Sequence, residues 1–193
     1  NLNYTTVYRP AVVEYGLEER YPEWRPHLVG GFGGFGHHRL VEAGSLRLGA
    51  VVILGPLVVL AGEVEGAFAR TTETGNIGQD ILGRFSRVTL DYPGGRLILE
   101  LGPDGLGEGS RPDRLGFTAA GRMVVLVWEG SPAQLAGLVE GDVILALDGA
   151  PAEGLSGVEL AEWASAEPGT PRTLTVLREG VALELSMTTE ELW

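Results

Sequence analysis

The stretch Glu129–Gly149, EGSPAQLAGLVEGDVILALDG, decides the fold of the carboxyl-terminal half of the chain. Pro132–Ala136 predicts a short helix, and Asp142–Leu147 predicts a strand that is followed by the turn residues Asp148 and Gly149. A short helix and a strand this close together, with glycine and proline at their boundaries, indicate a small α+β unit.

The segments on both sides of this stretch complete the predicted unit. Ser156 and Glu159 have the S-x-x-E spacing of a capping box, which predicts a helix over residues 157–165. Alternating or β-branched runs predict three further strands, at Arg122–Trp128, Arg172–Arg178 and Val181–Met187.

Taken in order, these motifs resemble the PDZ family over roughly residues 114–188. The matching residues are Gly130-Ser131-Pro132-Ala133, Ala136-Gly137-Leu138, Gly141-Asp142-Val143-Ile144 and Asp148-Gly149. Upstream, RLGF at Arg114–Phe117 matches three of the four positions of the family's G-L-G-F carboxylate-binding loop. The resemblance implies a PDZ domain over residues 114–193 that holds the C-terminal peptide of a partner in a groove.

The physics of the RLGF loop agrees with that role. Gly116 permits a tight bend, which can aim the backbone N–H groups of Leu115, Gly116 and Phe117 at one oxyanion. A captured peptide could add as a strand beside residues 117–119, with Leu115 and Phe117 lining the pocket for its last side chain. Val158, on the following helix, is a candidate for the groove. The alternative is that RLGF is only a turn into a strand.

A change in composition separates this unit from what precedes it. Residues 102–113, GPDGLGEGSRPD, are Gly, Pro and acid with almost nothing to bury, which predicts a linker. Residues 1–101 carry mostly strand signals, with one short helix predicted at Gln79–Phe85. The predicted strands are Leu46–Leu48, Val51–Leu54, Leu57–Leu60, Ser86–Asp91 and Arg96–Leu101. The fold class is therefore mainly β, followed by a small α+β domain.

The glycine-rich stretch Leu28–Gly36, LVGGFGGFG, has three candidate explanations: a phosphate-binding loop, a linker or a mobile hairpin. A phosphate loop needs a helix after its glycines, often with Lys, whereas the following His37–Val41 reads as a strand and the sequence contains no Lys. A linker would be polar, but apolar side chains alternate with these glycines. We therefore expect a hairpin that closes over a ligand, formed by Gly30, Gly31, Phe32, Gly33, Gly34 and Phe35.

Three motifs of the first unit resemble the bacterial branch of the retropepsin-like aspartic peptidases. The glycine-rich hairpin is similar to the flap that folds over the substrate. Gly75–Phe85, GNIGQDILGRF, resembles the hydrophobic-Gly-x-Asp/Asn segment at the family's single helix, and Arg87–Leu101 resembles its closing hairpin. The resemblance implies a partial retropepsin-like β-barrel whose flap, at residues 28–36, contacts a peptide substrate through Phe32 and Phe35.

That family hydrolyses peptide bonds with two aspartates that share a proton, each in an Asp-Thr/Ser-Gly turn. No such turn occurs in this sequence; the nearest string, Glu73-Thr74-Gly75, follows the flap instead of preceding it. Asp80 and Asp91 belong to the helix and hairpin motifs. We expect the turn just before Asn1, so the chain has no catalytic residue of its own and is expected to be inactive alone. A homodimer and an internal repeat are both compatible as the source of the second aspartate.

Composition excludes several partners and cofactors. The net charge of −12 and the pI of about 4.6 argue against nucleic acid and anionic membranes. The apolar run at residues 48–62 is too short for a membrane span and is broken by Gly55-Pro56. Without cysteine there is no thiolate site, and His37 and His38 on one strand point to opposite faces, so no metal or cofactor is expected. A chain without cysteine is compatible with an oxidising and with a reducing compartment.

Three alternatives to a peptidase with a PDZ module remain. A serine peptidase with the same module is weakened because no serine lies in a G-x-S-x-G or G-x-S-G-G string. A non-catalytic PDZ protein with a degenerate β-barrel would bind peptides without cleaving them. A PDZ unit with a purely structural role would bind no peptide that ends in a free carboxylate.

Overall fold

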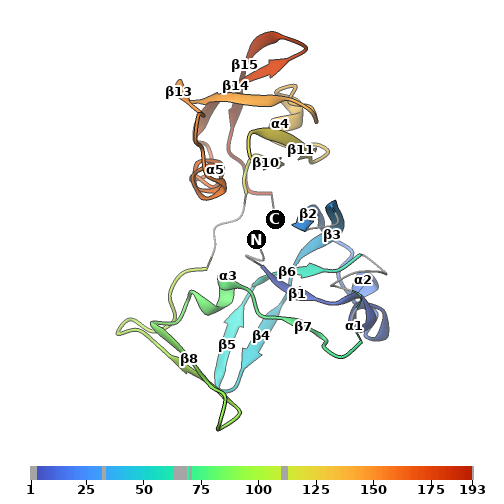
Figure 1. The fold of residues 1–193 in the computed structure, drawn as a ribbon, viewed down its shortest axis with the longest axis vertical. Helices are drawn as coiled ribbons and strands as arrows, with labels where there is room; N and C mark the ends of the chain where they lie inside the picture. The colour runs from blue at the N-terminus through green and yellow to red at the C-terminus, as the bar shows by residue number, and fades with distance from the viewer. Residues whose placement is uncertain (1–3, 32–33, 63–68, 70, 110–112, 193) are drawn as a thin grey trace. The chain divides into compact units, whose positions relative to one another are not determined.

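The computed structural model describes residues 4–31, 34–62, 69, 71–109 and 113–192, and the side chains of residues 30, 31, 34 and 35 are not described. The chain divides into two units, Asn1–Ser110 and Arg111–Trp193 (Figure 1). Strands predominate, as predicted. None of the helices in the described part is long and apolar enough to cross a membrane.

The first unit is built on a five-stranded sheet. Its order is β2 (Arg25–Gly31), β3 (Gly34–Glu42), β6 (Leu57–Leu60), β1 (Thr5–Val7) and β7 (Gly75–Asn76). Only the pairing of β1 with β6 is parallel among the described pairs of this sheet. The partial barrel expected from the sequence is thus an open sheet, because no pairing between described strands joins its two edges.

Two separate hairpins and a short helix complete this unit. β4 (Ser45–Leu48) pairs with β5 (Val51–Leu54), and β8 (Arg87–Asp91) pairs with β9 (Arg96–Glu100). The helix α3 (Gln79–Leu82) is shorter than predicted, because Gly83 is its C-cap and the following turns have i→i+3 hydrogen bonds. Its predicted apolar face holds at Ile81 and Phe85, which are buried with Ile53.

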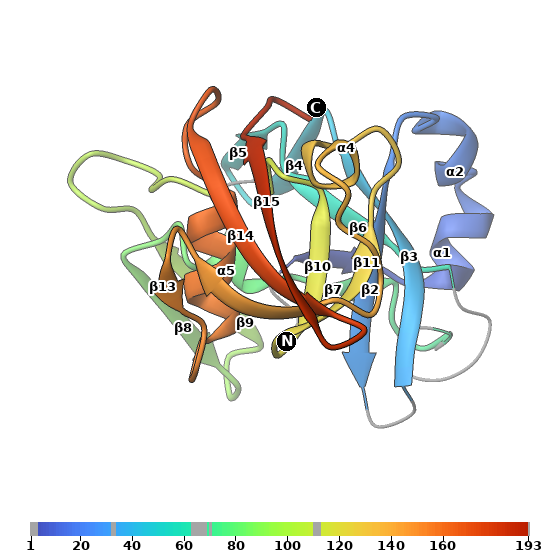
Figure 2. The same cartoon turned by 90° about the horizontal axis from the view of Figure 1, so that it is seen from above.

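Two helices near the amino terminus were not expected from the sequence. They are α1 (Arg9–Glu14) and α2 (Leu17–Arg20), and Figure 2 shows both beside β3. Pro10 lies in the first turn of α1, where a backbone N–H has no acceptor within the helix, so its lack of an N–H costs no hydrogen bond. Val12 packs against Val41, Val58 and Leu60, so α1 covers one face of the sheet.

The glycine-rich stretch forms the antiparallel hairpin that the sequence predicts. Gly30 pairs with Phe35 and Gly31 with Gly34 at the ends of β2 and β3. Phe32 and Gly33, the tip of the expected flap, lie outside the described residues. The contact of Phe32 and Phe35 with a substrate therefore stays a prediction.

The second unit is a sheet in the order β10 (Phe117–Ala120), β11 (Met123–Val127), β12 (Val143–Leu147), β14 (Pro171–Arg178) and β15 (Val181–Thr188). The short β13 (Ala150–Pro151) pairs with β12. The helices are α4 (Pro132–Leu135) and α5 (Gly157–Ala164), close to their predicted bounds. Figure 2 shows β14 and β15 running side by side as a long hairpin.

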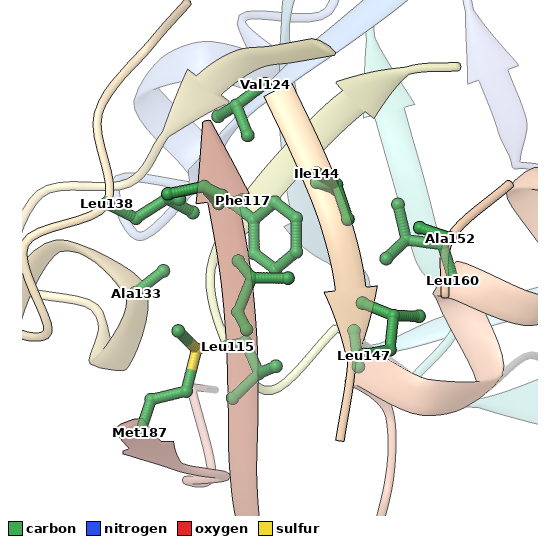
Figure 3. Close-up of a cluster of buried hydrophobic side chains, with 13 residues drawn as sticks. Leu115, Phe117, Val124, Ala133, Leu138, Ile144, Leu147, Ala152, Leu160 and Met187 are labelled. Carbon is green, nitrogen blue, oxygen red and sulfur yellow. The ribbon is translucent and has the colours of Figure 1, made fainter. Parts of the chain in front are cut away.

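The capping box predicted for α5 is present, with Ser156 accepting the N–H of Glu159 and the Glu159 carboxylate accepting that of Ser156. Trp163 packs the helix against the sheet, as expected, and its indole N–H donates to Asp148 at 2.7 Å. Figure 3 shows the core beneath, where Leu115 and Phe117 point into the same cluster as Ile144 and Leu138.

Candidate functional site

The loop at residues 113–117 gathers backbone donors around one carboxylate. The side chain of Asp113 accepts the N–H of Leu115 on Oδ1 at 2.9 Å and the N–H of Phe117 on Oδ2 at 3.0 Å. The N–H of Gly116 lies between them, 3.2 Å from Oδ1 and 3.1 Å from Oδ2. These are the same backbone groups that the sequence proposed for an oxyanion, and here they converge on an internal one.

Gly116 is required at the centre of this loop for two reasons. Its φ is +80°, a left-handed conformation that side chains rarely adopt. A Cβ there would also lie 2.3 Å from Cβ of Ser131, which leaves no room for alanine. The Gly116 carbonyl accepts the N–H of Trp128 at 2.8 Å and the hydroxyl of Ser131 at 3.3 Å, so packing and hydrogen bonds fix the bend.

Arg114 anchors the start of the loop to the end of α5. Its N–H donates to the carbonyl of Ala164 at 3.1 Å, and its guanidinium donates to the carbonyl of Ala166. The same guanidinium makes ion pairs with Glu167 and Glu191, at 3.8 and 3.5 Å. The Arg114 charge is therefore turned toward these acids.

The strand that leaves the loop has a free side. Among the described strands β10 pairs with β11 alone, so it is an edge strand of the sheet. Val158 on α5 is 60% exposed and is available to a ligand. Leu115 and Phe117 are only 0% and 6% exposed, because their side chains face the core. The N–H groups of both residues donate to Asp113, and their side chains belong to the interior cluster, so their expected role in lining a pocket for the ligand stays a prediction.

Burial and hydrogen bonding shift the pKa of the Asp113 carboxyl in opposite directions. Removal from water raises the pKa of the Asp113 carboxyl to about 6, although the surrounding backbone N–H groups lower it. The ionised carboxylate is therefore less favourable in this seat than in water, in spite of its donors.

In the first unit, Asp80 is a buried carboxylate that joins two segments. Its Oδ1 accepts the N–H of Thr5 at 2.9 Å and the Thr5 hydroxyl at 3.3 Å. The Thr5 hydroxyl oxygen in turn accepts the N–H of Gly78 at 3.0 Å. Burial raises the pKa of Asp80. Asp91, in contrast, sits on the β8–β9 hairpin with Arg96, so these two aspartates form no pair.

The three histidines of the first unit differ in their surroundings. His37 is exposed and His38 is buried, as alternation on one strand predicts. His27 contacts the ring of Tyr4 edge-on at 5.3 Å, and burial, with the nearby His38, lowers the pKa of His27 to about 4. No group of three His, Asp or Glu side chains in the described part of the chain is arranged to hold a metal ion.

A hollow of about 460 Å³ lies beside β1 in the first unit. Thr5, Val7, Tyr15 and Ile77 are among its lining residues, and none of the lining residues that the structure describes is Asp, Glu or His. It therefore offers no carboxylate for acid–base chemistry.

Sequence reasoning missed Asp113, because it lies in a stretch whose composition reads as a linker. A local signal was present: an aspartate commonly accepts the N–H two residues further on, which here is that of Leu115. The same stretch is partly fixed to the first unit, since Gly107 and Arg84 exchange two hydrogen bonds.

A family model described as PDZ domain matches residues 123–178. Together with the loop geometry and strand order, this match shows that the second unit is a PDZ domain, a peptide-binding module. None of the curated proteins matches the chain.

Several solved structures are similar at low identity. A serine endoprotease from Yersinia pestis is 18% identical over 90% of this chain and 63% of its own, with a TM-score of 0.41. The HtrA-type protease AlgW with decapeptide is 20% identical over 88% and 60%, with a TM-score of 0.34. An aminopeptidase N family protein from Idiomarina loihiensis is 23% identical over 42% and 14%, also with a TM-score of 0.34. The chain spans less than two thirds of each, and this similarity assigns no activity to it.

Proposed function

We propose that the PDZ unit captures the carboxyl terminus of a peptide or protein at the loop formed by residues 113–117. The observation that carries this proposal is the convergence of the N–H groups of Leu115, Gly116 and Phe117 on a single carboxylate. Consecutive N–H groups in such a bend form an anion site, and the terminal carboxylate of a peptide has the same chemistry as the side chain now seated there.

The free edge of β10 sets the direction of the ligand. With its carboxylate at the amino-terminal end of β10, the peptide runs antiparallel to that strand and adds to the sheet. Val158 lies six residues before Ala164, or about 9 Å along the helix axis. An extended peptide covers that distance in about three residues. Val158 is thus proposed to contact the side chain two or three positions before the ligand's last residue.

Binding of peptides with a free carboxylate tests this proposal. Fluorescently labelled peptides of random sequence with apolar last residues are titrated with the full chain, and anisotropy is measured. We expect saturable binding that Val158→Asp weakens, while Val181→Asp, at an exposed site on β15, leaves it unchanged. Absence of binding by every peptide, including those selected from a C-terminal library, would contradict a peptide-binding role.

For the first unit we propose the body of an aspartic peptidase lobe that hydrolyses peptide bonds. Three features support the resemblance: the glycine-rich β2–β3 hairpin, the closing β8–β9 hairpin and the buried contact between Asp80 and Thr5. The last feature ties the Gly-x-Asp segment to β1, which lies within the sheet between β6 and β7. An aspartyl turn that leads into β1 would therefore adjoin the strand end that Asp80 of α3 holds through Thr5.

In this proposal the described residues bind and cover substrate, and the acid pair comes from the aspartyl turn and its counterpart. The glycines of the hairpin allow it to open and close, and Phe32 and Phe35 contact the substrate when it closes. One aspartate activates water while the other, protonated, donates to the leaving group. The present chain is expected to be inactive alone.

The reading frame before Asn1 tests the peptidase proposal. An Asp-Thr-Gly or Asp-Ser-Gly codon run a few residues upstream is expected, and protein that includes it should cleave a denatured protein substrate at acidic pH. Replacement of that aspartate by Asn should abolish cleavage. Without the turn, the proposal fails and the alternative, a non-catalytic peptide-binding protein with a degenerate β-sheet unit, stands.

A further inference from the structure

The backbone donors of the PDZ loop are already engaged within the chain. Asp113 uses both carboxylate oxygens, and its contacts with Leu115, Gly116 and Phe117 range from 2.9 to 3.2 Å. A ligand carboxylate bound at the loop would need these same N–H groups. Each N–H donates one proton, so Asp113 and a peptide terminus cannot both occupy the loop with full hydrogen bonding.

Within the described residues, Asp113 lacks the arginine ion pair that holds each of the other two aspartates of this unit. Asp142 is paired with Arg178 at 2.7 Å and Asp148 with Arg172 at 2.8 Å, whereas Asp113 makes no ion pair with any described residue. The adjacent guanidinium of Arg114 is directed to Glu167 and Glu191 instead. The partners of Asp113 in the described part of the chain are backbone N–H groups of residues two to four positions further on.

The loop has supports other than Asp113. Its carbonyl groups are fixed from the other side, since Trp128 and Ser131 donate to the Gly116 carbonyl and Ala133 donates to that of Leu115. The N–H of Arg114 is bound to α5. Displacement of the Asp113 side chain therefore leaves the donors in place for another carboxylate.

We propose that Asp113 determines the specificity of the PDZ unit by acting as an internal competitor for the terminal carboxylate of the ligand. In the native chain a free terminal carboxylate gains little over an uncharged terminus, because it must first displace Asp113. The unit then selects ligands mainly by the segment along β10 and α5, and internal or blocked peptides bind nearly as well as free termini. This inference rests on the proposed peptide-binding function.

The size of the effect follows from competition. An internal ligand that fills the loop for about nine tenths of the time lowers the apparent affinity for a competing carboxylate about tenfold. The useful quantity is the ratio of dissociation constants for an amidated and a free-acid peptide of the same sequence. We expect this ratio to be within about threefold of one for the native chain and to exceed tenfold once Asp113 is removed.

The experiment compares the full-length native chain with Asp113→Ala and Asp113→Asn, at pH 7. Glu153→Ala is the matched control, because it removes an acidic group that is exposed in the same unit and lies outside the loop. The probe is a fluorescent peptide selected for binding, made as free acid and as amide. Circular dichroism and hydrogen exchange check that each variant keeps the native fold.

We expect Asp113→Ala to bind the free acid at least tenfold more tightly than the native chain does, and to bind the amide with unchanged affinity. The free-acid affinity of Asp113→Asn should lie between those of Asp113→Ala and the native chain. Glu153→Ala should bind both peptides as the native chain does. If the native chain already prefers the free acid tenfold and Asp113→Ala binds it equally or less well, the inference is overturned while the proposed function stands. If neither peptide form binds any variant, both fail. If Asp113→Ala does not fold, a folded Asp113→Asn variant provides the test. A free-acid affinity that is unchanged or lower in Asp113→Asn would also overturn the inference.

Discussion

The buried and half-buried carboxylates of the two units differ in how far along the sequence their partners lie. Asp80 in the first unit bonds to Thr5, 75 positions away in the sequence, and Asp142 in the second bonds to Arg178, 36 positions away. Among the described residues, Asp113 bonds only to those two to four positions further on. The first two join separate elements and hold the fold together. The third satisfies a local set of donors, which another carboxylate could satisfy equally well.

The largest expected effect is at the most buried of these groups. Asp142 is fully buried and accepts two charged hydrogen bonds from Arg178, which keep the pKa of Asp142 below its usual value. Asp142→Ala should destabilise the second unit by about 4 kcal/mol, because it breaks a buried pair and leaves the N–H of Val139 without its acceptor. Urea denaturation followed by hydrogen exchange in the second unit measures this. A decrease in the free energy of unfolding below about 1 kcal/mol would show that Asp142, like Asp113, is not needed to hold the fold together.

Gly116→Ala tests whether packing, and not Asp113, shapes the loop. The left-handed φ and the 2.3 Å approach to Ser131 should together cost about 3 kcal/mol of stability and abolish peptide binding. The matched control is Gly149→Ala. Gly149 has the same φ of +80° but nothing within 4 Å of its Cβ position, so its substitution should cost about 1 kcal/mol and leave binding intact. Equal effects at the two glycines would show that the loop is not held by close packing.

Asp80→Ala tests whether the carboxylate of the first unit also holds separate elements together. Loss of the carboxylate leaves the buried N–H of Thr5 without an acceptor, and we expect about 2 kcal/mol of destabilisation confined to that unit. Asp80→Asn, which keeps one acceptor oxygen, should lose less than half of this. Hydrogen exchange should report faster opening of β1 and α3 and unchanged protection in the second unit. Unchanged protection in the first unit would assign no structural role to Asp80.

The smallest expected effect is a pH dependence of binding. Burial raises the pKa of the seated Asp113 to about 6, whereas a displaced aspartate in water titrates near 3.9. Displacement by a ligand therefore releases a proton between these pH values, while the ligand carboxylate, which enters the same environment, takes one up. The two changes offset each other in the native chain, so its affinity for a free-acid peptide should change by less than about twofold between about pH 4.5 and about pH 6.5. Asp113→Ala has only the uptake by the ligand, so its affinity should fall severalfold as the pH rises over this range.

Anisotropy titrations at stepped pH on the native chain and on Asp113→Ala measure this difference. An affinity for the free acid that falls as steeply in the native chain as in Asp113→Ala would show that Asp113 is not displaced.

The sequence was informative where a residue type has one strong local meaning. The capping box at Ser156 and Glu159, the β8–β9 hairpin and the glycine-rich β2–β3 hairpin all appear as predicted. The helix α1 was missed because it is only six residues long, and its stability comes from Val12 packing on the sheet and not from its own pattern. The expected barrel required pairings between distant strands, which no local pattern specifies.

The candidate site shows the same division. The donors Leu115, Gly116 and Phe117 were predicted from a short motif, since a glycine bend aims successive N–H groups in one direction. The direction of the Leu115 and Phe117 side chains depends on the tertiary core around Ile144, which a short motif does not specify. Asp113 was overlooked because its partner is the loop itself, whose geometry is set by packing against Trp128 and Ser131.

The most direct test of the central claim follows the amide resonances of Leu115, Gly116 and Phe117 in ¹H–¹⁵N spectra of Asp113→Ala during peptide titration. If the loop binds the terminal carboxylate, these three amides should shift strongly with the free-acid peptide and little with its amide, while both forms perturb β10 residues such as Ala119. Saturating free-acid peptide that leaves the three amides unmoved would contradict binding at the loop, because the terminal carboxylate would then be held elsewhere.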